Sequence, residues 1–269
     1  MRTDLSFFVQ VSILYQARFE NHLWDRFTEP EGDGVAAACL FLEGYAFERQ
    51  GRDPSYAHAA VAAVEKARIL PGRHLGQTVR NEFFILLPGQ KPNWKMSPLD
   101  HRDEQGCNCV WCVFDGENIV TATKQSMLND QVKPIWERLQ RIRGVGPKIA
   151  SLFLRDVAVR YGLTPRAERH LLQPVDVWVR RTVHWMTNSN GMGDEHVAQW
   201  IVDECEKPEL ANQGIWYFGA QIAQSEFTLR KALGDRAWAW TAVQDHIASL
   251  EATLAAAKAL RGWHNQCPS

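Results

Sequence analysis

The sequence lacks any long hydrophobic run. No apolar stretch among its 269 residues approaches the roughly 20 residues that a membrane-spanning helix requires. The apolar segment 6–14 is interrupted by Gln10, and Asp4 stands where a secretory signal would carry a basic residue. The sequence therefore predicts a cytoplasmic protein that does not associate with a membrane.

Internal repeats and low-complexity tracts are also absent. With 45% hydrophobic and 23% charged residues, the composition is that of a globular chain, so disorder is not expected to dominate. In a reducing compartment the six cysteines are thiols or metal ligands sooner than a disulfide framework. The 11 tryptophans are numerous for this length and must serve a core, a pocket or a stacking surface.

Net charge is nearly absent as well, at −1. Its distribution is uneven, because the segment 133–181 carries eleven Lys and Arg against four Asp and Glu, a local balance of +7. The remainder of the chain must then carry −8. A basic block on an acidic body indicates one surface that faces a polyanion.

Apolar residues recur at helical spacing over most of the chain, which predicts a mainly α fold. The exception is the segment at about 71–130, where repeated Pro and Gly predict a loop-rich, Cys-containing insertion with at most short strands. Asp176 opens an apolar segment and is a natural N-cap. The expected helices cover residues 35–47, 56–70, 132–142, 147–159, 177–186 and 237–260.

Two of these predicted helices are joined by Gly144-Val145-Gly146, followed by Pro147, which suits the first turn of a helix. Glycines permit a tight turn, and the following helix N-terminus presents unpaired amides to an anion. Such a turn, preceded by arginines, is suited to gripping a nucleic-acid phosphate without reading sequence. A plain helix–helix turn is the alternative. The predicted backbone contacts are Arg141, Arg143, Gly144, Val145 and Gly146.

The segment Gly144-Val145-Gly146-Pro147-Lys148, followed by Val175-Asp176, resembles the motif pair of the helix-hairpin-helix DNA glycosylase superfamily, which includes endonuclease III-like and 8-oxoguanine glycosylases. Arg143 stands where that family often has proline. The separation of 28 positions between Lys148 and Asp176 exceeds that of common bacterial members and is closer to archaeal 8-oxoguanine glycosylases. The sequence is thus similar to a divergent member.

The resemblance implies two helical lobes that flank a DNA-binding cleft. One lobe would span residues 36–165, end in the helix-hairpin-helix and contain the insertion. Residues 1–35 and 166–269 would form the second lobe, which carries the aspartate. The expected partner is double-stranded DNA with a modified base, bound by a monomer in the nucleoid-associated cytoplasm.

The resemblance also implies chemistry at Lys148 and Asp176. Lys148, at a helix N-terminus beside basic residues, would attack the sugar C1′ and form a Schiff base, without a cofactor. Asp176 would stabilise positive charge on the sugar and orient the nucleophile. Without catalysis, Lys148 would bind phosphate and Asp176 would only cap a helix.

The resulting prediction is a DNA glycosylase with lyase activity, acting in base-excision repair or against modified foreign DNA. An oxidised purine is the first substrate expected, and a modified cytosine or other pyrimidine the second. Two alternatives remain: a non-catalytic module that binds DNA structure, and a metal-dependent nuclease organised by cysteines.

Three closely spaced cysteines form a candidate metal knuckle: Cys107, Cys109 and Cys112. The fourth ligand would be His101 or Cys205, with Cys267 also considered, and the site would hold a structural zinc or an iron–sulfur cluster. Three reduced thiols packed among apolar neighbours are the alternative.

An enzyme that acts on a base within a duplex extrudes it and holds it between apolar or aromatic faces. Trp178, Trp216 and Phe218 are the candidate pocket walls. Aromatic residues at helical spacing also serve as ordinary core, and that alternative applies to each of the three.

Overall fold

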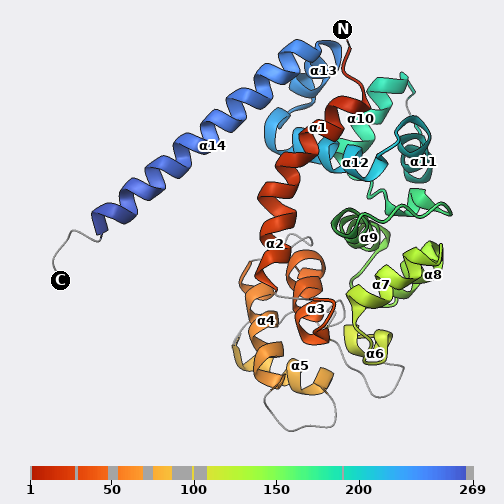
Figure 1. Ribbon diagram of the computed structural model, residues 1–269, viewed down its shortest axis with the longest axis vertical. Helices are drawn as coiled ribbons and strands as arrows, with labels where there is room; N and C mark the ends of the chain where they lie inside the picture. The colour runs from red at the N-terminus through yellow and green to blue at the C-terminus, as the bar shows by residue number, and fades with distance from the viewer. Residues whose placement is uncertain are drawn as a thin grey trace.

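The secondary structure of the computed structural model is helical wherever it is described (Figure 1). Residues 2–27, 30–47, 54–68, 75–86, 99, 108–189 and 191–264 are described, and these ranges contain no strand. The prediction of a mainly α protein is confirmed. No described helix combines the length and apolar character needed to cross a bilayer.

Helices lie at each of the six segments for which the apolar spacing predicts one, and further helices lie between them. Short π- and 3-10 elements extend or connect them: η1 (Gln16–Glu20), η2 (Leu42–Phe47), η5 (Arg169–Leu172) and η6 (Phe218–Ala223). The α-helices are α1 (Leu5–Tyr15), α2 (Asn21–Arg26), α3 (Gly34–Phe41), α4 (Pro54–Arg68), α5 (Leu75–Leu86), α6 (Val110–Phe114), α7 (Ile119–Leu128), α8 (Val132–Gln140), α9 (Pro147–Tyr161), α10 (Val177–Thr187), α11 (Asp194–Glu204), α12 (Pro208–Tyr217), α13 (Glu226–Gly234) and α14 (Arg236–His264).

Buried apolar side chains form two clusters. The first core draws on residues between 24 and 172, with Phe41, Phe114 and Phe153 fully buried in it. The second core combines α1 with the helices from α10 to α14. In Figure 1 the helices of the first core occupy the lower half and those of the second core the upper half. The N-terminal helix thus packs with the C-terminal third of the chain.

A close helix contact fixes α1 to α12. A Cβ atom on Gly214 would stand 1.8 Å from the carbonyl oxygen of Phe8, so only glycine lets the two backbones approach this far. Phe8 and Phe218 lie edge to face just beyond this contact, with ring centroids 6.0 Å apart. The apolar segment near the N-terminus is therefore a core helix.

Along the chain, the switch from one core to the other occurs at positions that differ from the predicted lobe boundaries. Trp24 already belongs to the first core, and Leu172 still does. The second core ends at Tyr15 and resumes at Val179. The breaks after residues 35 and 165 were those that the resemblance implied, whereas long-range packing decides which cluster each helix joins.

The prediction of a loop-rich segment at 71–130 was wrong for its described part. This part contains α5, α6 and α7. Val79 and Phe83, four residues apart, are buried on one face of α5. Proline and glycine flank that helix in the sequence, and the prediction extended their helix-breaking effect over the residues between them. Residues 87–98 and 100–107 lie outside the described ranges.

A buried arginine connects the two cores. Arg155 on α9 is 1% exposed, and its Nη1 donates to Asn212 Oδ1 on α12 at 2.9 Å. Its Nη2 donates to Tyr15 Oη on α1 at 2.7 Å, and Nε and Nη2 both donate to Asp156 Oδ1. Because each interaction is desolvated, removing one partner is expected to cost about 3–5 kcal/mol. This network holds α9 against α1 and α12.

A buried carboxyl group extends the network. Gln213 Nε2 donates to Glu20 Oε2 at 2.7 Å and to Asp156 Oδ1 at 3.3 Å. Burial, reinforced by the Asp156 carboxylate, raises the pKa of Glu20 to about 8. Glu20 is therefore protonated at neutral pH in the folded chain, and ionised in the unfolded chain.

Glu20→Gln is expected to remove a pH-dependent loss of stability. Between about pH 5 and pH 8 the unfolded chain releases the Glu20 proton while the folded chain retains it, so folding loses free energy as the pH rises. Glutamine keeps an acceptor for Gln213 and does not titrate. Thermal unfolding should show the wild-type Tm falling by a few degrees relative to the variant over this range. Parallel Tm curves would contradict a raised Glu20 pKa.

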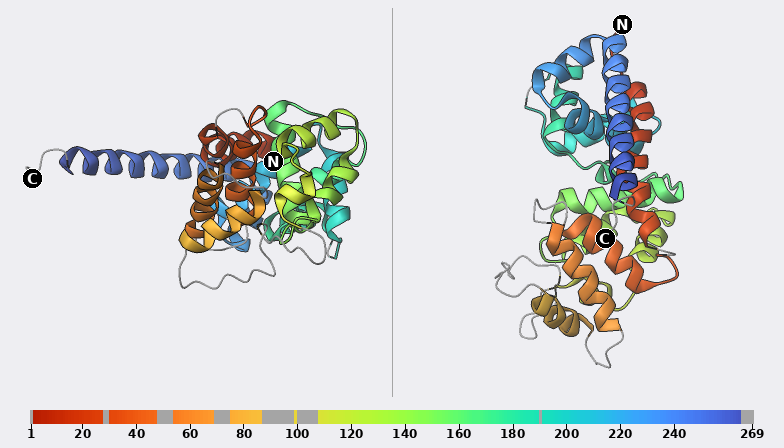
Figure 2. Two further views of the ribbon diagram at one scale, coloured as in Figure 1. Left: turned by 90° about the horizontal axis from the view of Figure 1, so that it is seen from below. Right: turned by 90° about the vertical axis from the view of Figure 1, so that its left-hand side faces the viewer.

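The long helix α14 leaves the body of the protein. Its first turns pack on the second core through Ala239 and Val243, which are buried. Figures 1 and 2 show its remaining length projecting away from every other helix.

Candidate active site

The turn between α8 and α9 places its groups by simple backbone requirements. Gly144 has φ 85°, a left-handed conformation that favours glycine. The Val145 side chain is buried, and its amide donates to the Ile142 carbonyl at 3.0 Å. Pro147 occupies the first turn of α9, as predicted. The turn is thereby rigid, with its second glycine at the N-cap of α9.

Gly146 differs from Gly144 in what it requires. Its φ of −95° and ψ of 179° are accessible to any residue. A Cβ atom on Gly146 would meet no protein atom within 4 Å. The protein itself therefore imposes no glycine here, and the bare backbone faces open space at the N-terminus of α9.

Lys148 and Asp176 line the same small cavity. Its volume is about 190 Å³, and both residues contribute to its wall although 27 residues separate them in the chain. The other lining residues are Ile149, Leu152, Arg155, Pro174, Asn212 and Trp216. A lysine, an aspartate and a tryptophan thus line one partly apolar cavity.

Asp176 is the N-cap of α10, as predicted. Its Oδ1 accepts hydrogen bonds from the amides of Trp178 at 2.8 Å and Val179 at 2.9 Å. The cap orients the carboxylate and uses one oxygen only. The other oxygen, Oδ2, lies outside the cap.

The buried network also positions Asp176. Asn212, which is fully buried, donates from Nδ2 to the carbonyl of Pro174 at 3.2 Å and accepts from Arg155 at 2.9 Å. Arg155 therefore supports, through Asn212, the segment that carries the carboxylate. Neither Arg155 nor Asn212 was singled out from the sequence. The visible signal was the charged pair Arg155-Asp156 within an otherwise apolar helix face.

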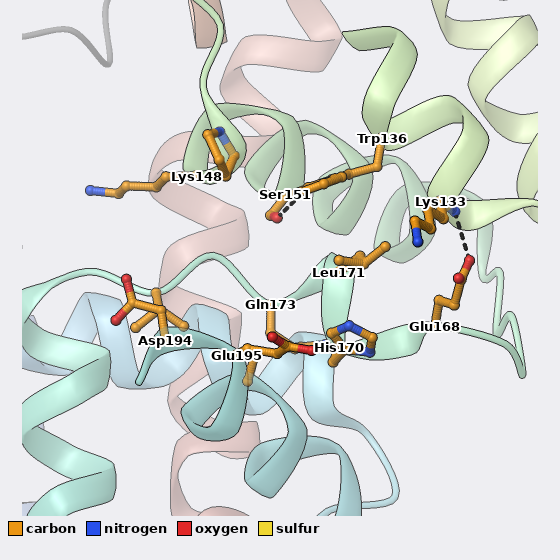
Figure 3. A pocket seen from close by; sticks show the side chains of 13 residues that line it. Lys133, Trp136, Lys148, Ser151, Glu168, His170, Leu171, Gln173, Asp194 and Glu195 are labelled. Atoms are coloured by element: carbon orange, nitrogen blue, oxygen red, sulfur yellow. Dashed lines mark hydrogen bonds between the residues drawn. The ribbon is translucent and has the colours of Figure 1, made fainter. Parts of the chain in front are cut away.

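A second, larger cavity adjoins Lys148 on the other side of segment 173–176. It has a volume of about 460 Å³, and Figure 3 shows Trp136 and Ser151 on one wall with His170 and Glu195 on the other. Trp136 Nε1 donates to Ser151 Oγ at 3.0 Å. Lys148 lines both cavities, so it stands at the point where they adjoin.

Segment 173–176 separates the two cavities, because its successive side chains point alternately to one cavity and to the other. Gln173 and Val175 line the larger cavity, whereas Pro174 and Asp176 line the smaller one. Gln173 and Asp176 are both extended, and successive side chains of an extended backbone point to opposite sides. The larger cavity could not be predicted from the sequence, because its walls come from helices distant in the chain.

Of the three predicted aromatic pocket walls, Trp216 lines the cavity with Lys148 and Asp176. Its ring stands edge to face against Tyr15, at a centroid distance of 5.7 Å, and against Phe19, at 5.4 Å. These contacts fix the plane of the indole at the cavity wall.

The other two aromatic residues are placed elsewhere. Phe218 is fully buried in the second core and packs edge to face on Phe7. Trp178 packs against Gly219, where a Cβ atom would stand 2.8 Å from the Trp178 Cβ. Neither residue lines the cavity that holds Lys148 and Asp176. Both act as packing residues, which is the alternative that helical spacing left open.

The cysteine knuckle is described only in part. Cys109 Sγ lies 3.5 Å from Cys112 Sγ at the start of α6. Cys107 and His101 lie outside the described residues. Cys205 follows α11 and packs against the second core, whereas α6 belongs to the first core (Figure 1). Among the described cysteines, Cys205 therefore lies apart from Cys109 and Cys112.

The positive charge that the basic block at 133–181 presents on the surface is smaller than its sequence sum of +7. Acidic residues from outside the block pair with five of its arginines, and a sixth arginine is buried against its neighbour. These pairs are Arg138–Glu117, Arg155–Asp156, Arg160–Asp25, Arg169–Glu209, Arg180–Asp194 and Arg181–Glu226. Arg141 and Lys148, on either side of the turn, remain exposed. Positive charge thus remains at the N-terminus of α9, and Lys133 and Arg166, elsewhere in the block, are exposed as well.

No family model matches the sequence, and neither the curated proteins nor the solved structures contain a match.

Proposed function

We propose that the protein is a DNA glycosylase with associated lyase activity. The observation that carries this proposal is the shared cavity of Lys148 and Asp176, which the chain brings together from 28 positions apart. A nucleophilic amine and a carboxylate beside an aromatic wall are the groups that base excision through a covalent intermediate requires. The α8–α9 turn serves, in this proposal, as the helix-hairpin-helix that holds the DNA backbone.

Lys148 is the nucleophile. Its amine attacks C1′ of the extruded nucleotide, and the bond from C1′ to the base nitrogen breaks with the electron pair leaving on the base. The amine nitrogen then loses its two protons, one to the departing base and one to the ring oxygen O4′ as the C1′–O4′ bond breaks, and a Schiff base links Nζ to C1′. Loss of a C2′ proton then expels the 3′ phosphate by β-elimination, which is the lyase step.

Asp176 stabilises the positive charge that develops on the sugar as the base departs. Its Oδ1 is held by two amides of α10, which leaves Oδ2 outside the cap. Leu152 and Trp216 give the cavity the apolar wall against which a base can stack. The substrate we favour remains an oxidised purine, with a modified pyrimidine second, in repair or in defence against modified DNA.

The bare backbone at Gly146 supports the DNA contact. A phosphate at the N-terminus of α9 would accept hydrogen bonds from free amides and face the positive end of the helix dipole. Since no protein atom fills the space beside Gly146, a bound phosphate explains the glycine there.

Gly146→Ala is expected to weaken binding to duplex DNA by about tenfold or more. The added Cβ would occupy the space of the phosphate and break its hydrogen bonds to the backbone, and a hydrogen bond to a charged group contributes roughly 1.5–3 kcal/mol. The fold should tolerate the change, at a cost of about 1 kcal/mol for a poorer N-cap. Fluorescence anisotropy with labelled duplex gives the affinity. Gly234→Ala is the matched control, since its Cβ also meets nothing within 4 Å and α13 is remote from the turn. Equal affinities of the two variants would remove Gly146 from the interface.

Mass spectrometry of the bases released from diverse genomic and phage DNAs tests the proposed function directly. The protein should release a modified base, and the release should depend on Asp176. A binding module would bind duplexes tightly and release nothing. A cysteine-organised nuclease would cleave undamaged DNA, lose that activity on chelation or in Cys109→Ser, and retain it in Asp176→Asn. Either outcome would replace the glycosylase proposal.

A further inference from the structure

The projecting part of α14 has no partner among the described residues. Residues 251–259 are exposed along their whole length, and Leu254 is 55% exposed. The left view of Figure 2 shows this part of the helix clear of the body. The segment is rich in alanine, which favours a helix, yet it also exposes Leu254, a large apolar residue that helix formation alone does not require.

An apolar stripe continues from the packed part of α14 into the projecting part. Val243 is buried in the second core, and Ile247 is partly buried against it. Leu250, Leu254 and Ala257 follow at alternating spacings of three and four residues. This is the spacing of the a and d positions in a coiled coil. The stripe therefore extends beyond the second core, which buries only the first residues of the stripe.

Charged residues flank the stripe in a self-complementary way. With Ile247 and Leu254 at a and Leu250 at d, Glu251 and Lys258 both fall at e. In an antiparallel pair of helices, e positions face e positions of the other helix. Glu251 of one copy then lies opposite Lys258 of the other, and the reciprocal pair forms by symmetry.

We propose that α14 is a self-association surface, through which a second copy of this chain packs antiparallel against the segment 247–258. Leu250 of each copy lies against Leu254 of the other, and Ile247 lies against Ala257. The sequence alone predicted a monomer. The exposed stripe and its flanking charges argue instead for a homodimer, independently of the proposed activity.

An antiparallel arrangement fits better than a parallel one. In a parallel pair Glu251 would face the g position, His246. His246 is already engaged, because its Nε2 lies 2.9 Å from Tyr217 Oη. Burial lowers the pKa of His246, which disfavours the charged form that such a pair would need. Antiparallel packing also places the two bodies at opposite ends of the helix pair.

Sedimentation velocity of the full chain over a wide concentration range tests the surface. The expected result is a shift from 30.7 kDa toward twice that mass as concentration rises into the high-micromolar range. Leu254→Lys should abolish the shift. Ala252→Lys places the same charge on the opposite face of the helix and should keep it. A wild-type chain that stays monomeric, or equal behaviour of the two variants, would overturn the proposal.

A charge-reversal pair tests the antiparallel register. Glu251→Lys alone and Lys258→Glu alone should each weaken the dimer about tenfold or more, because each places two like-charged pairs across the interface. An equimolar mixture of the two variants should dimerise again, since both cross-pairs are then opposite in charge. Residues 251 and 258 are seven apart and do not neighbour each other within one helix, so restoration reports the contact between copies. Failure to restore the dimer would exclude this register.

Discussion

Replacing Lys148 with alanine is expected to abolish covalent trapping of the protein on DNA. In the proposed reaction a Schiff base links Lys148 Nζ to C1′, and borohydride reduces this imine to a stable amine. Alanine has no nitrogen to form the bond, and water supplies no trappable substitute. The measurement is a protein–DNA band on a denaturing gel after incubation with borohydride and a duplex that carries the released base.

Lys133→Ala provides the matched control for that experiment. Lys133 lines the larger cavity beside Lys148 but not the smaller one with Asp176. Its loss removes the same charge from the same region, so trapping at saturating DNA should persist. If Lys148→Ala instead weakened binding and left the trapped yield at saturation unchanged, Lys148 would be a phosphate contact, and the nucleophile would lie elsewhere.

Asp176→Asn is expected to lower the rate of base release by about 10²–10³-fold, the effect typical of removing one electrostatic group that stabilises a transition state. Asparagine cannot balance the positive charge on the sugar. It remains as good an N-cap as aspartate, so the amides of Trp178 and Val179 keep their acceptor and stability should not change. Single-turnover release of the base, measured beside thermal unfolding, gives both quantities.

Asp176→Ala separates the two roles of this residue. Alanine removes the charge and the cap together, so the variant should lose activity and also about 1 kcal/mol of stability. The asparagine variant should lose activity alone. An asparagine variant that releases base at the wild-type rate would show that Asp176 acts only as a helix cap. The shared cavity would then no longer support a catalytic role.

Local features of the site could be predicted from the sequence because they depend on neighbouring residues. Pro147 in the first turn of α9 and Asp176 at the N-cap of α10 follow from chain-local rules of helix ends, and the structure confirms both. The apolar spacing of α8 was equally readable, because only one face of that helix is buried, whereas residues 150–158 of α9 are buried on all sides.

Features that depend on distant partners could not be predicted. Arg155 was counted within a basic surface block, although it is buried and bonded to residues on α1 and α12. The counting assumed that charged residues face solvent, which fails where a network satisfies them. Phe218 was expected to line a pocket but is buried in the second core. Helical spacing alone does not distinguish a pocket wall from a core position. The larger cavity depends on how α8, η5 and α11 meet, which no single segment encodes.

The way Arg155 is bonded also constrains how the chain can diverge. Its guanidinium donates to Tyr15, Asp156 and Asn212, which lie on three different helices. Neutralising Arg155 alone strands the Asp156 carboxylate in a dry interior, and neutralising Asp156 alone strands the guanidinium. A substitution that removes the charge at only one of these two positions therefore gives a destabilised protein. Positions 155 and 156 should accordingly be inherited as a unit.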